Sequence, residues 1–263
     1  MSLWSRPPLV KGAWSRMGAR VSTVIPCYNA ATFIERALAS ALSQEGVDVD
    51  VIVVDDGSSD DSVARIRALG RLEPRIQLLS FSSNRGAAAA RNAGIERASA
   101  RYLAFLDADD WWRPNKLARQ VEMLKAQRAA LAYTGVEVHD ERGRALGRRR
   151  VPTRVGAEQL LVHNVIATSS VLIDTERVLP FRMPPLRMRQ DLATWYALLQ
   201  QGVRAFGLDE PLTVYTRRAD SLSANKAHAA AANWRLYRQH LGTPLPQAVA
   251  MFTKYAATAL VRP

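Results

Sequence analysis

The chain has 263 residues, of which 48% are hydrophobic and 23% charged, and its formal net charge is +12 at pH 7. This length exceeds the roughly 100–200 residues of an average domain, so we expect one large domain or one domain with an extension. The single cysteine, Cys27, excludes an intrachain disulfide. No run of about 18 uncharged apolar residues occurs, so no membrane-spanning helix is predicted.

The basic charge favours anionic partners such as nucleic acid, acidic lipid or phosphorylated substrates. An arginine-rich solvated surface explains the charge equally well. No zinc-finger spacing or RNA-binding signature occurs, so we do not expect a nucleic-acid partner. The four histidines lack metal-ligand spacing, which argues against zinc.

The first 19 residues mix Trp4 and Trp14 with arginine, lysine and proline, and they lack the apolar stretch of a secretory signal. We expect a disordered leader. The alternative interpretation is an anchor at a membrane surface, because tryptophan and basic residues favour that environment.

From residue 21 to about residue 127, predicted strands alternate with predicted helices. Short β-branched or apolar runs predict strands at 21–26, 49–54, 76–81 and 102–106. Helical spacing predicts helices over 30–42, after a cap at Ser59 or Asp60, over 86–98, and from Pro114 to about 127. Such alternation indicates a parallel sheet with helices on both faces.

The alternation weakens after residue 129. Strands are predicted at 131–139, 169–173 and 205–217, and helices at 191–200, 227–241 and 247–260. We therefore expect a mixed second half that ends in a helical extension.

Polar clusters follow three of the first four predicted strands, at 27–29, 55–60 and 107–110. Ligands of parallel sheets bind beyond the carboxyl ends of the strands. The three clusters should therefore meet on one rim, and this convergence is the central prediction from the residues.

Each cluster has a chemical and a structural interpretation. Asp107 and Asp109 are spaced to reach one hard cation, which would offset charge on a departing diphosphate, or they form a helix-capping turn. Asp56 beside Gly57 suits a base N–H or a ribose hydroxyl, or an ordinary strand-to-helix turn. Tyr28 suits stacking on a base, or the core.

Two arginines and the single cysteine also have chemical and structural interpretations. Arg85 and Arg91 suit a phosphate or a base carbonyl, or are solvent-facing arginines at a helix start. Cys27 is interpreted as a small core side chain, since no neighbour would lower its pKa enough for catalysis.

Taken together, four motifs resemble the family 2 glycosyltransferases: P-C-Y-N (26–29), V-D-D-G-S-S-D (54–60), N-R-G with A-R-N-A-G (84–94), and F-L-D-A-D-D (105–110). Their order and separations also match. The resemblance is strong over 21–125 and looser to about residue 225. It implies an α/β GT-A fold for nucleoside-diphosphate-sugar transfer, with a mostly parallel central sheet flanked by helices.

The resemblance also implies a division of the chain and a reaction. Residues 20–128 would bind the nucleotide sugar, 129–223 would bind the acceptor and carry the catalytic base, and 224–263 would be the helical extension. The donor would be a nucleoside-diphosphate sugar, most often a UDP-sugar, with Mg²⁺ or Mn²⁺ as cofactor and inversion at the anomeric carbon.

Motif by motif, the resemblance assigns site residues. Asp109 would bind the metal and Asp191, within R-Q-D-L, would be the catalytic base; Asp191 is equally suited to cap a helix. The donor-binding residues would be Pro26, Tyr28, Asn29, Asp56, Arg85, Asp107, Ala108, Arg217 and Arg218. A histidine frequent in the family is replaced near Ala219, so the residue facing the diphosphate stays open.

The predicted function is the transfer of one sugar to a hydroxyl of a glycan or polyprenyl-linked acceptor, in cell-surface polysaccharide or glycolipid biosynthesis. The absence of Q-x-x-R-W, a signature of processive synthases, favours one sugar per acceptor. We expect a cytoplasmic location, peripheral at the inner face of the plasma membrane. The alternatives are a nucleotidyltransferase, which normally has a glycine-rich phosphate loop that 26–29 does not supply, and an inactive sugar-binding homologue.

Overall fold

A computed structural model describes residues 18–178, 180–218 and 226–260. Most of the predicted leader, with Trp4 and Trp14, and the stretch around Ala219 lie outside the described residues.

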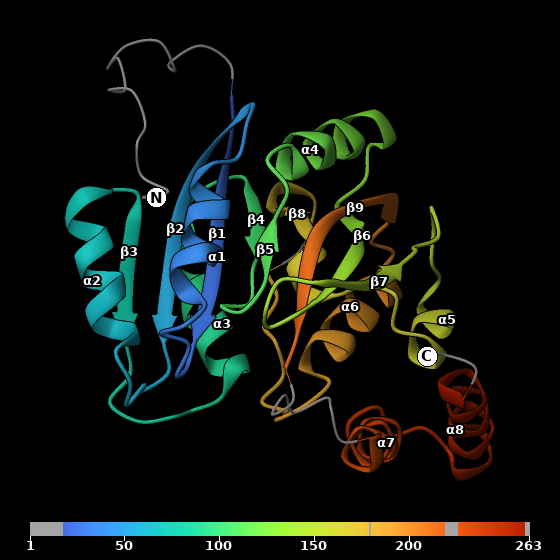
Figure 1. The fold of residues 1–263 in the computed structure, drawn as a ribbon. Helices are drawn as coiled ribbons and strands as arrows, with labels where there is room; N and C mark the ends of the chain where they lie inside the picture. The colour runs from blue at the N-terminus through green and yellow to red at the C-terminus, as the bar shows by residue number, and fades with distance from the viewer. Residues whose placement is uncertain (1–17, 179, 219–225, 261–263) are drawn as a thin grey trace.

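One sheet runs through the described part of the chain, with the strand order β3-β2-β1-β4-β8-β6-β9-β5. Its first four strands are parallel, as predicted: β1 (Ala19–Cys27), β2 (Val47–Asp55), β3 (Ile76–Ser80) and β4 (Tyr102–Phe105). Their arrowheads point to the same end of the molecule in Figure 1. The predicted α/β fold class and its parallel half are confirmed.

The rest of the sheet is mixed, as expected. Strand β8 (Leu172–Asp174) runs antiparallel to both β4 and β6 (Leu131–Asp140), and β9 (Ala205–Arg217) runs parallel to β6. Because β8 is antiparallel to both of its neighbours, β6 and β9 run in the same direction as β1–β4. Strand β7 (Ala145–Arg149) forms a hairpin with β6, and the unpredicted short strand β5 (Trp111–Trp112) pairs with β9.

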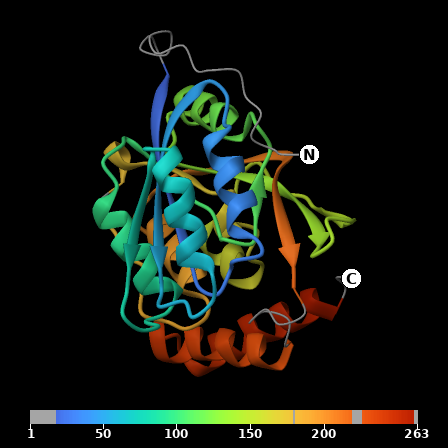
Figure 2. The same cartoon turned by 60° about the vertical axis from the view of Figure 1, so that its left-hand side comes forward.

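Helices cover both faces of the sheet (Figures 1 and 2). Helices α1 (Ile34–Leu42), α2 (Ser62–Leu72) and α4 (Lys116–Gln127) pack on one face. Helices α3 (Ala87–Arg97), α5 (Ala157–Val162) and α6 (Gln190–Gln200) pack on the other. The strands show the period of two that this requires: Tyr102 and Ala104 face the first group, Leu103 and Phe105 the second.

The C-terminal extension consists of α7 (Lys226–Arg235), a five-residue π-helical segment η3 (Leu236–His240) and α8 (Leu245–Leu260). Leu236, Tyr237 and Ala248 are buried against the second core, and the Tyr237 hydroxyl donates to the Leu161 carbonyl at 2.7 Å. The extension is therefore packed onto the body of the protein.

Three predicted boundaries were wrong. Helix α1 begins at Ile34, where a helix was expected from residue 30. Residues Thr168–Ser170 form a 3₁₀ turn, η1, where a strand was expected from residue 169. Side-chain hydroxyls of this turn bond to nearby backbone, as Ser170 Oγ does to the Ala167 carbonyl at 2.7 Å. Such local bonds compete with the hydrogen bonds of a strand. Helix α4 begins at Lys116 rather than Pro114, whose carbonyl accepts the Glu45 amide.

The N-cap residue of α2 is Asp61 rather than Ser59 or Asp60, and Asp60 accepts the amide of Ser62, the first helical residue, at 3.0 Å. A second 3₁₀ turn, η2 (Thr175–Arg177), follows β8.

Candidate active site at the carboxyl ends of the strands

The first two polar clusters form one surface. Strands β1 and β2 end in register, with Cys27 opposite Asp55. Beyond them the Asn29 amide donates to Ser58 Oγ at 2.9 Å, and Asn29 Oδ1 accepts the Ser59 amide at 2.8 Å. Asn29 holds a left-handed φ of 48°, which asparagine tolerates better than most residues. Asn29 thus joins the two loops.

Asp56 connects the third strand's exit to this surface. Its buried carboxylate accepts the backbone amides of Arg85 at 2.7 Å and Gly86 at 2.8 Å. Its own amide donates to the Cys27 carbonyl. Each carboxylate oxygen keeps a further lone pair for a ribose or base. Asp56 therefore shapes the loop around any nucleoside that binds there.

Gly57 is needed where these loops meet. Its φ of 75° is left-handed, and a Cβ added there would lie 2.8 Å from the Ser83 carbonyl carbon. Any other residue would be strained and would push the 83–86 loop away.

Tyr28 and Arg85 both lie open to solvent beside this loop. The Tyr28 side chain is 50% exposed, so the interpretation of it as a core tyrosine was wrong. Arg85 is exposed, with its guanidinium 4.6 Å from the centre of the Phe81 ring. Cys27, which precedes Tyr28, is buried, and burial raises the pKa of its thiol to about 12, in line with its interpretation as a core side chain.

Three aspartates follow β4, and the structure gives them different surroundings. Asp110 is buried: its Oδ2 accepts Ser169 Oγ at 2.6 Å and its Oδ1 accepts the Thr216 amide at 3.0 Å. Burial, and then the charges of Asp109 and Asp107, raise its pKa well above the usual range. Asp110 thus ties β4 to η1 and to the end of β9.

The Asp109 carboxylate has little positive charge around it. Arg218 lies nearest, with Nη1 3.7 Å from Asp109 Oδ2. Burial and the neighbouring Asp107 charge raise the pKa of Asp109 to about 6, and Arg218 only partly opposes them. The Asp109 carbonyl is fixed by Arg36 Nη2 at 3.2 Å and Thr216 Oγ1 at 2.5 Å. A cation beside this carboxylate would relieve the repulsion.

The residues fit a divalent cation that also binds phosphate. Among the described residues, no cluster of three or more Asp, Glu, His or Cys is arranged to hold a metal. Asp107 and Asp109 supply hard oxygen ligands, and Mg²⁺ typically takes one or two protein carboxylates with phosphates and waters completing its shell. Ala108 between them is buried.

Arg91 lies beneath the aspartates. Its side chain is buried, and Nη2 donates to Asp107 Oδ1 at 2.5 Å, while its Nε and Nη1 have no hydrogen-bond partner among the described residues. Burial lowers the pKa of Arg91, but the charges of Asp107, Asp191 and Asp110 outweigh it, so that the pKa is raised. Arg91 is thus surrounded by carboxylates from both halves of the chain.

Asp191 belongs to the same group. It lies in the first turn of α6, and its Oδ2 accepts Thr168 Oγ1 at 3.2 Å. Arg189 before it adopts a left-handed φ of 67°. The structure therefore places Asp191, the predicted base, within electrostatic reach of Arg91.

The remaining predicted residues lie at the rim. Arg218 stacks over the Phe33 ring at 5.0 Å as well as facing Asp109, and Arg217 is exposed at the end of β9. Pro26 is half-buried in β1.

Three residues that shape the site were not predicted from the sequence. Arg36 and Thr216 fix the Asp109 carbonyl and bond each other at 3.0 Å. Asn92 pairs with both backbone groups of Met183, at 2.8 and 2.9 Å. No sequence signal marks Arg36 or Thr216, whereas Asn92 lies inside the A-R-N-A-G motif.

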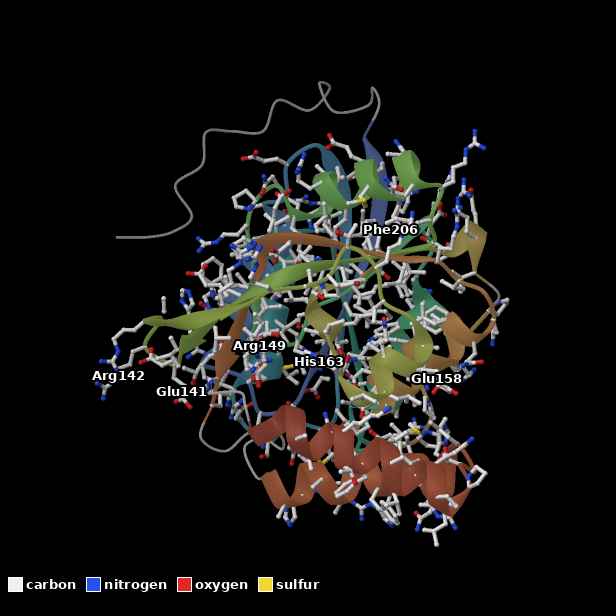
Figure 3. The ribbon with its side chains drawn as sticks, turned by 90° about the vertical axis from the view of Figure 1, so that its right-hand side faces the viewer. Glu141, Arg142, Arg149, Glu158, His163 and Phe206 are labelled. Carbon is white, nitrogen blue, oxygen red and sulfur yellow. The ribbon has the colours of Figure 1, made fainter. Side chains whose placement is uncertain are left out.

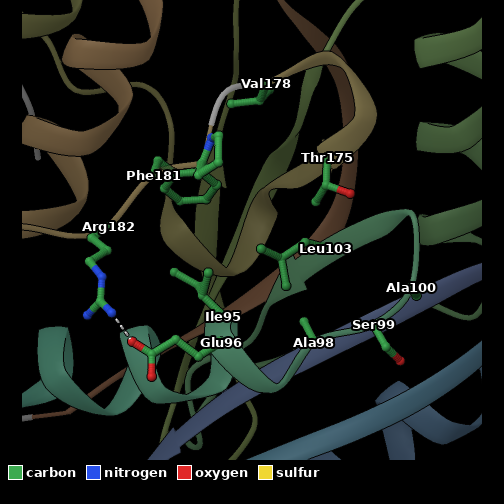
Figure 4. Close-up of a pocket in the computed structure, with 11 residues that line it drawn as sticks. Ile95, Glu96, Ala98, Ser99, Ala100, Leu103, Thr175, Val178, Phe181 and Arg182 are labelled. Carbon is green, nitrogen blue, oxygen red and sulfur yellow. Dashed lines mark ion pairs between the residues drawn. The ribbon is translucent and has the colours of Figure 1, made fainter.

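A pocket of about 760 Å³ lies elsewhere (Figure 4). It is lined by Ile95, Leu103, Val178 and Phe181 among others, and an ion pair between Glu96 and Arg182 crosses its edge. None of the predicted site residues lines it. It opens near the C-terminal end of α3, away from Gly86.

Comparison with known proteins identifies the family of the chain. The family model described as Glycosyl transferase family 2 matches residues 22–190. TuaG of Bacillus subtilis, a glycosyltransferase provisionally assigned by name to teichuronic acid biosynthesis, is 36% identical over 241 residues, covering 91% of this chain and 96% of the relative. WfgD of Escherichia coli, a UDP-Glc:α-D-GlcNAc-diphosphoundecaprenol β-1,3-glucosyltransferase, is 30% identical over 226 residues, covering 86% and 88%.

Solved structures show the same fold at low identity. Staphylococcus aureus TarS in complex with UDP-GlcNAc aligns over 90% of this chain and 71% of its own, with a TM-score of 0.67 and 16% identity. The mannosyltransferase PcManGT of Pyrobaculum calidifontis, in complex with GDP-Man and Mn²⁺, aligns over 94% and 76%, with a TM-score of 0.65 and 19% identity.

Proposed function

The chain belongs to glycosyl transferase family 2, and on that premise we propose that it moves one sugar from a UDP-sugar to a hydroxyl group of a lipid-linked glycan. The observation that carries the proposal is the linked network of carboxylates, in which Asp107, Arg91 and Asp191 interact across both halves of the chain.

Two sets of relatives support the substrates. WfgD is named for transfer from UDP-Glc to a diphosphoundecaprenol-linked sugar, and TuaG for teichuronic acid biosynthesis. TarS was solved with UDP-GlcNAc. We infer a UDP-sugar donor and an acceptor on a polyprenyl diphosphate, in cell-surface polysaccharide or glycolipid biosynthesis at the cytoplasmic face of the plasma membrane. The described residues contain no helix that is both long and apolar enough to span a bilayer.

Donor binding is assigned to the loops around Asp56. The exposed Tyr28 ring would stack on the base, Asp56 would use its remaining lone pairs on base or ribose, and Arg85 would approach from the opposite loop. Asp107 would contact the ribose. Arg217 and Arg218, at the end of β9, would face the diphosphate.

A divalent cation, Mg²⁺ or Mn²⁺, held by Asp109 with Asp107 nearby, would supply charge stabilisation for the departing diphosphate. The raised pKa of Asp109 supports this assignment, because the carboxylate lacks a full counter-charge in the protein alone.

Asp191 would act as the general base. As the acceptor oxygen forms its bond to the anomeric carbon, the bond from that carbon to the diphosphate oxygen breaks, and the acceptor proton passes to Asp191. One in-line displacement inverts the anomeric centre. Thr168, which donates to Asp191 Oδ2, would leave Oδ1 for the acceptor hydroxyl.

The test separates binding from transfer. Asp191→Asn should bind UDP with Mn²⁺ as the wild type does and lose transfer by about 10²–10⁴-fold, the usual contribution of a general base. Asp109→Ala should weaken Mn²⁺-dependent UDP binding in calorimetry. Asp48→Asn, an exposed aspartate paired with Arg20, is the matched control. Normal turnover by Asp191→Asn, or unchanged UDP binding by Asp109→Ala, would remove the respective assignment.

A further inference from the structure

The outer face of the C-terminal helices carries no negative charge. Residues 226–260 contain neither aspartate nor glutamate, and they include Lys226, Arg235, Arg238 and Lys254. Arg235, Arg238 and Lys254 are exposed. Such a surface attracts anions, and its attraction is not cancelled by neighbouring carboxylates on the same helices.

The exposed side of α8 is largely apolar. Five large hydrophobic side chains are exposed in the described residues, and two of them, Leu245 at 53% and Val249 at 49%, lie one turn apart on α8. Pro246, Ala250, Thr253 and Ala257 continue this exposed stripe at helical spacing. Lys254 is the only charged residue of α8.

The inner face of α7 and α8 packs on the body of the protein, so the two helices are firmly attached. Tyr237 is fully buried, and the Trp234 and Phe252 rings meet edge to face with centroids 5.5 Å apart, joining α7 to α8. Figure 3 shows α7 and α8 side by side along one end of the molecule.

That end is the one where the site lies. The arrowheads of β1–β3 point towards it, and α7 and α8 lie there in Figures 1 and 2. Strand β9, whose end carries Arg217 and Arg218, runs in the same direction. A flat surface in contact with α7 and α8 would therefore lie next to the rim that holds Asp109 and Asp191.

We propose that the outer face of α7 and α8 docks on an anionic lipid bilayer, with the α8 stripe in the interfacial region and Arg235 and Lys254 against lipid phosphates. The biological purpose rests on the proposed lipid-linked acceptor, which this docking would bring to the rim of the site. A second copy of the chain fits the face less well, because a symmetric contact would bring the same positive charges together.

The test is sedimentation of the full-length protein with vesicles, without nucleotide. The protein should bind vesicles containing phosphatidylglycerol, bind weakly to pure phosphatidylcholine, and dissociate at high salt. Arg235→Gln with Lys254→Gln should weaken binding roughly 25-fold, at about fivefold for each basic residue near the surface. Leu245→Ser with Val249→Ser should weaken it as well, at unchanged net charge.

Arg67→Gln with Arg71→Gln, which removes the same charge from the exposed side of α2, is the matched control and should bind nearly as the wild type does. If this control and the variant of Arg235 and Lys254 lost vesicle affinity equally, the net charge alone would explain binding, and the proposal would be overturned. A concentration-dependent dimer that the α8 variant abolishes would assign the face to a second copy instead. Vesicle binding without any sugar transfer would count against the proposed function and leave the docking face intact.

Discussion

At the scale of single residues, Arg91 explains how the site tolerates so many carboxylates. Its buried guanidinium donates to Asp107, and in the part of the chain that the structure describes its Nε and Nη1 atoms have no hydrogen-bond partners. A buried cation without full pairing is costly on its own. The surrounding charges of Asp107, Asp191 and Asp110 offset that cost. We infer that Arg91 positions Asp107 and lowers the repulsion among the aspartates.

Replacing Arg91 by methionine should therefore weaken Mn²⁺-dependent UDP binding by about 10–100-fold, because it removes the partner that positions Asp107 beside the proposed metal ligand Asp109. Loss of the positive charge also raises the pKa values of nearby carboxylates. The acidic limb of the pH–rate profile should consequently move to higher pH, and Arg91→Lys should restore part of the shift. Titration calorimetry and the pH dependence of kcat/KM measure the two effects.

Arg97→Met, on the exposed side of the same helix, is the control for the change in α3 itself. A purely structural role for Arg91 would lower the melting temperature and leave the pH profile of the remaining activity in place.

Single residues also show where sequence reasoning ends. The motif D-A-D-D places three aspartates in four positions, and the motif alone cannot separate the metal candidate Asp109 from Asp110. Only the fold brings Ser169 and Thr216 against Asp110, and those residues lie 59 and 106 positions away in the chain. The Asp110 side chain is hydrogen-bonded to Ser169 and to the Thr216 amide, whereas the Asp109 side chain lies 3.7 Å from Arg218.

At the scale of elements, α3 connects the two halves of the site. Arg91 and Asn92 are neighbours in sequence but point about 100° apart around the helix. Arg91 reaches Asp107 after β4, and Asn92 holds the backbone of Met183, in the segment that leads to α6 and Asp191. Gly94 lets the helix lie close to β1, since a Cβ there would clash with the Val24 side chain.

Asn92→Ala should therefore release the 183–189 segment and misplace Asp191 without disturbing the donor loops. We expect kcat to fall by about tenfold or more while the KM for the donor sugar stays near that of the wild type, since small displacements of catalytic groups cost rate. Steady-state kinetics with donor and acceptor varied separately give the two constants.

Asn92→Asp is an informative companion, because it can accept the Met183 amide proton but cannot donate to the Met183 carbonyl. The kcat of Asn92→Asp should lie between those of the wild type and Asn92→Ala. A rise in donor KM with kcat unchanged would show that Asn92 serves the nucleotide side instead.

The elements of the first half were predictable because their signals are local. Apolar runs and helical periods located β1–β4 and α1–α3 to within a few residues. The long strands β6 and β9 were also predicted, whereas the short strands β5 and β7 were not. Strand β5 has two residues, and its pairing with β9 depends on residues about 100 positions away. Contacts of that range leave no local pattern.

At the scale of the whole molecule, charge is unevenly distributed. The net charge is +12, yet the site itself gathers Asp56, Asp107, Asp109, Asp110 and Asp191. A UDP-sugar approaches through the field of the whole protein before it meets those carboxylates. The long-range field is positive, so it should accelerate the encounter with a dianionic donor and should be screened by salt.

Raising the ionic strength with KCl at saturating Mn²⁺ should therefore lower kcat/KM for the donor severalfold and leave kcat nearly constant, because screening acts on encounter rather than on the bound complex. Arg67→Glu with Arg71→Glu lowers the net charge by four at exposed positions on α2, outside the site. This variant should start from a lower kcat/KM and show a shallower salt dependence. Initial rates of UDP release with a water-soluble acceptor measure both, which separates donor encounter from any contact with lipid. If the variant kept the wild-type slope, the attraction would come from Arg217 and Arg218 at the rim rather than from the molecule as a whole.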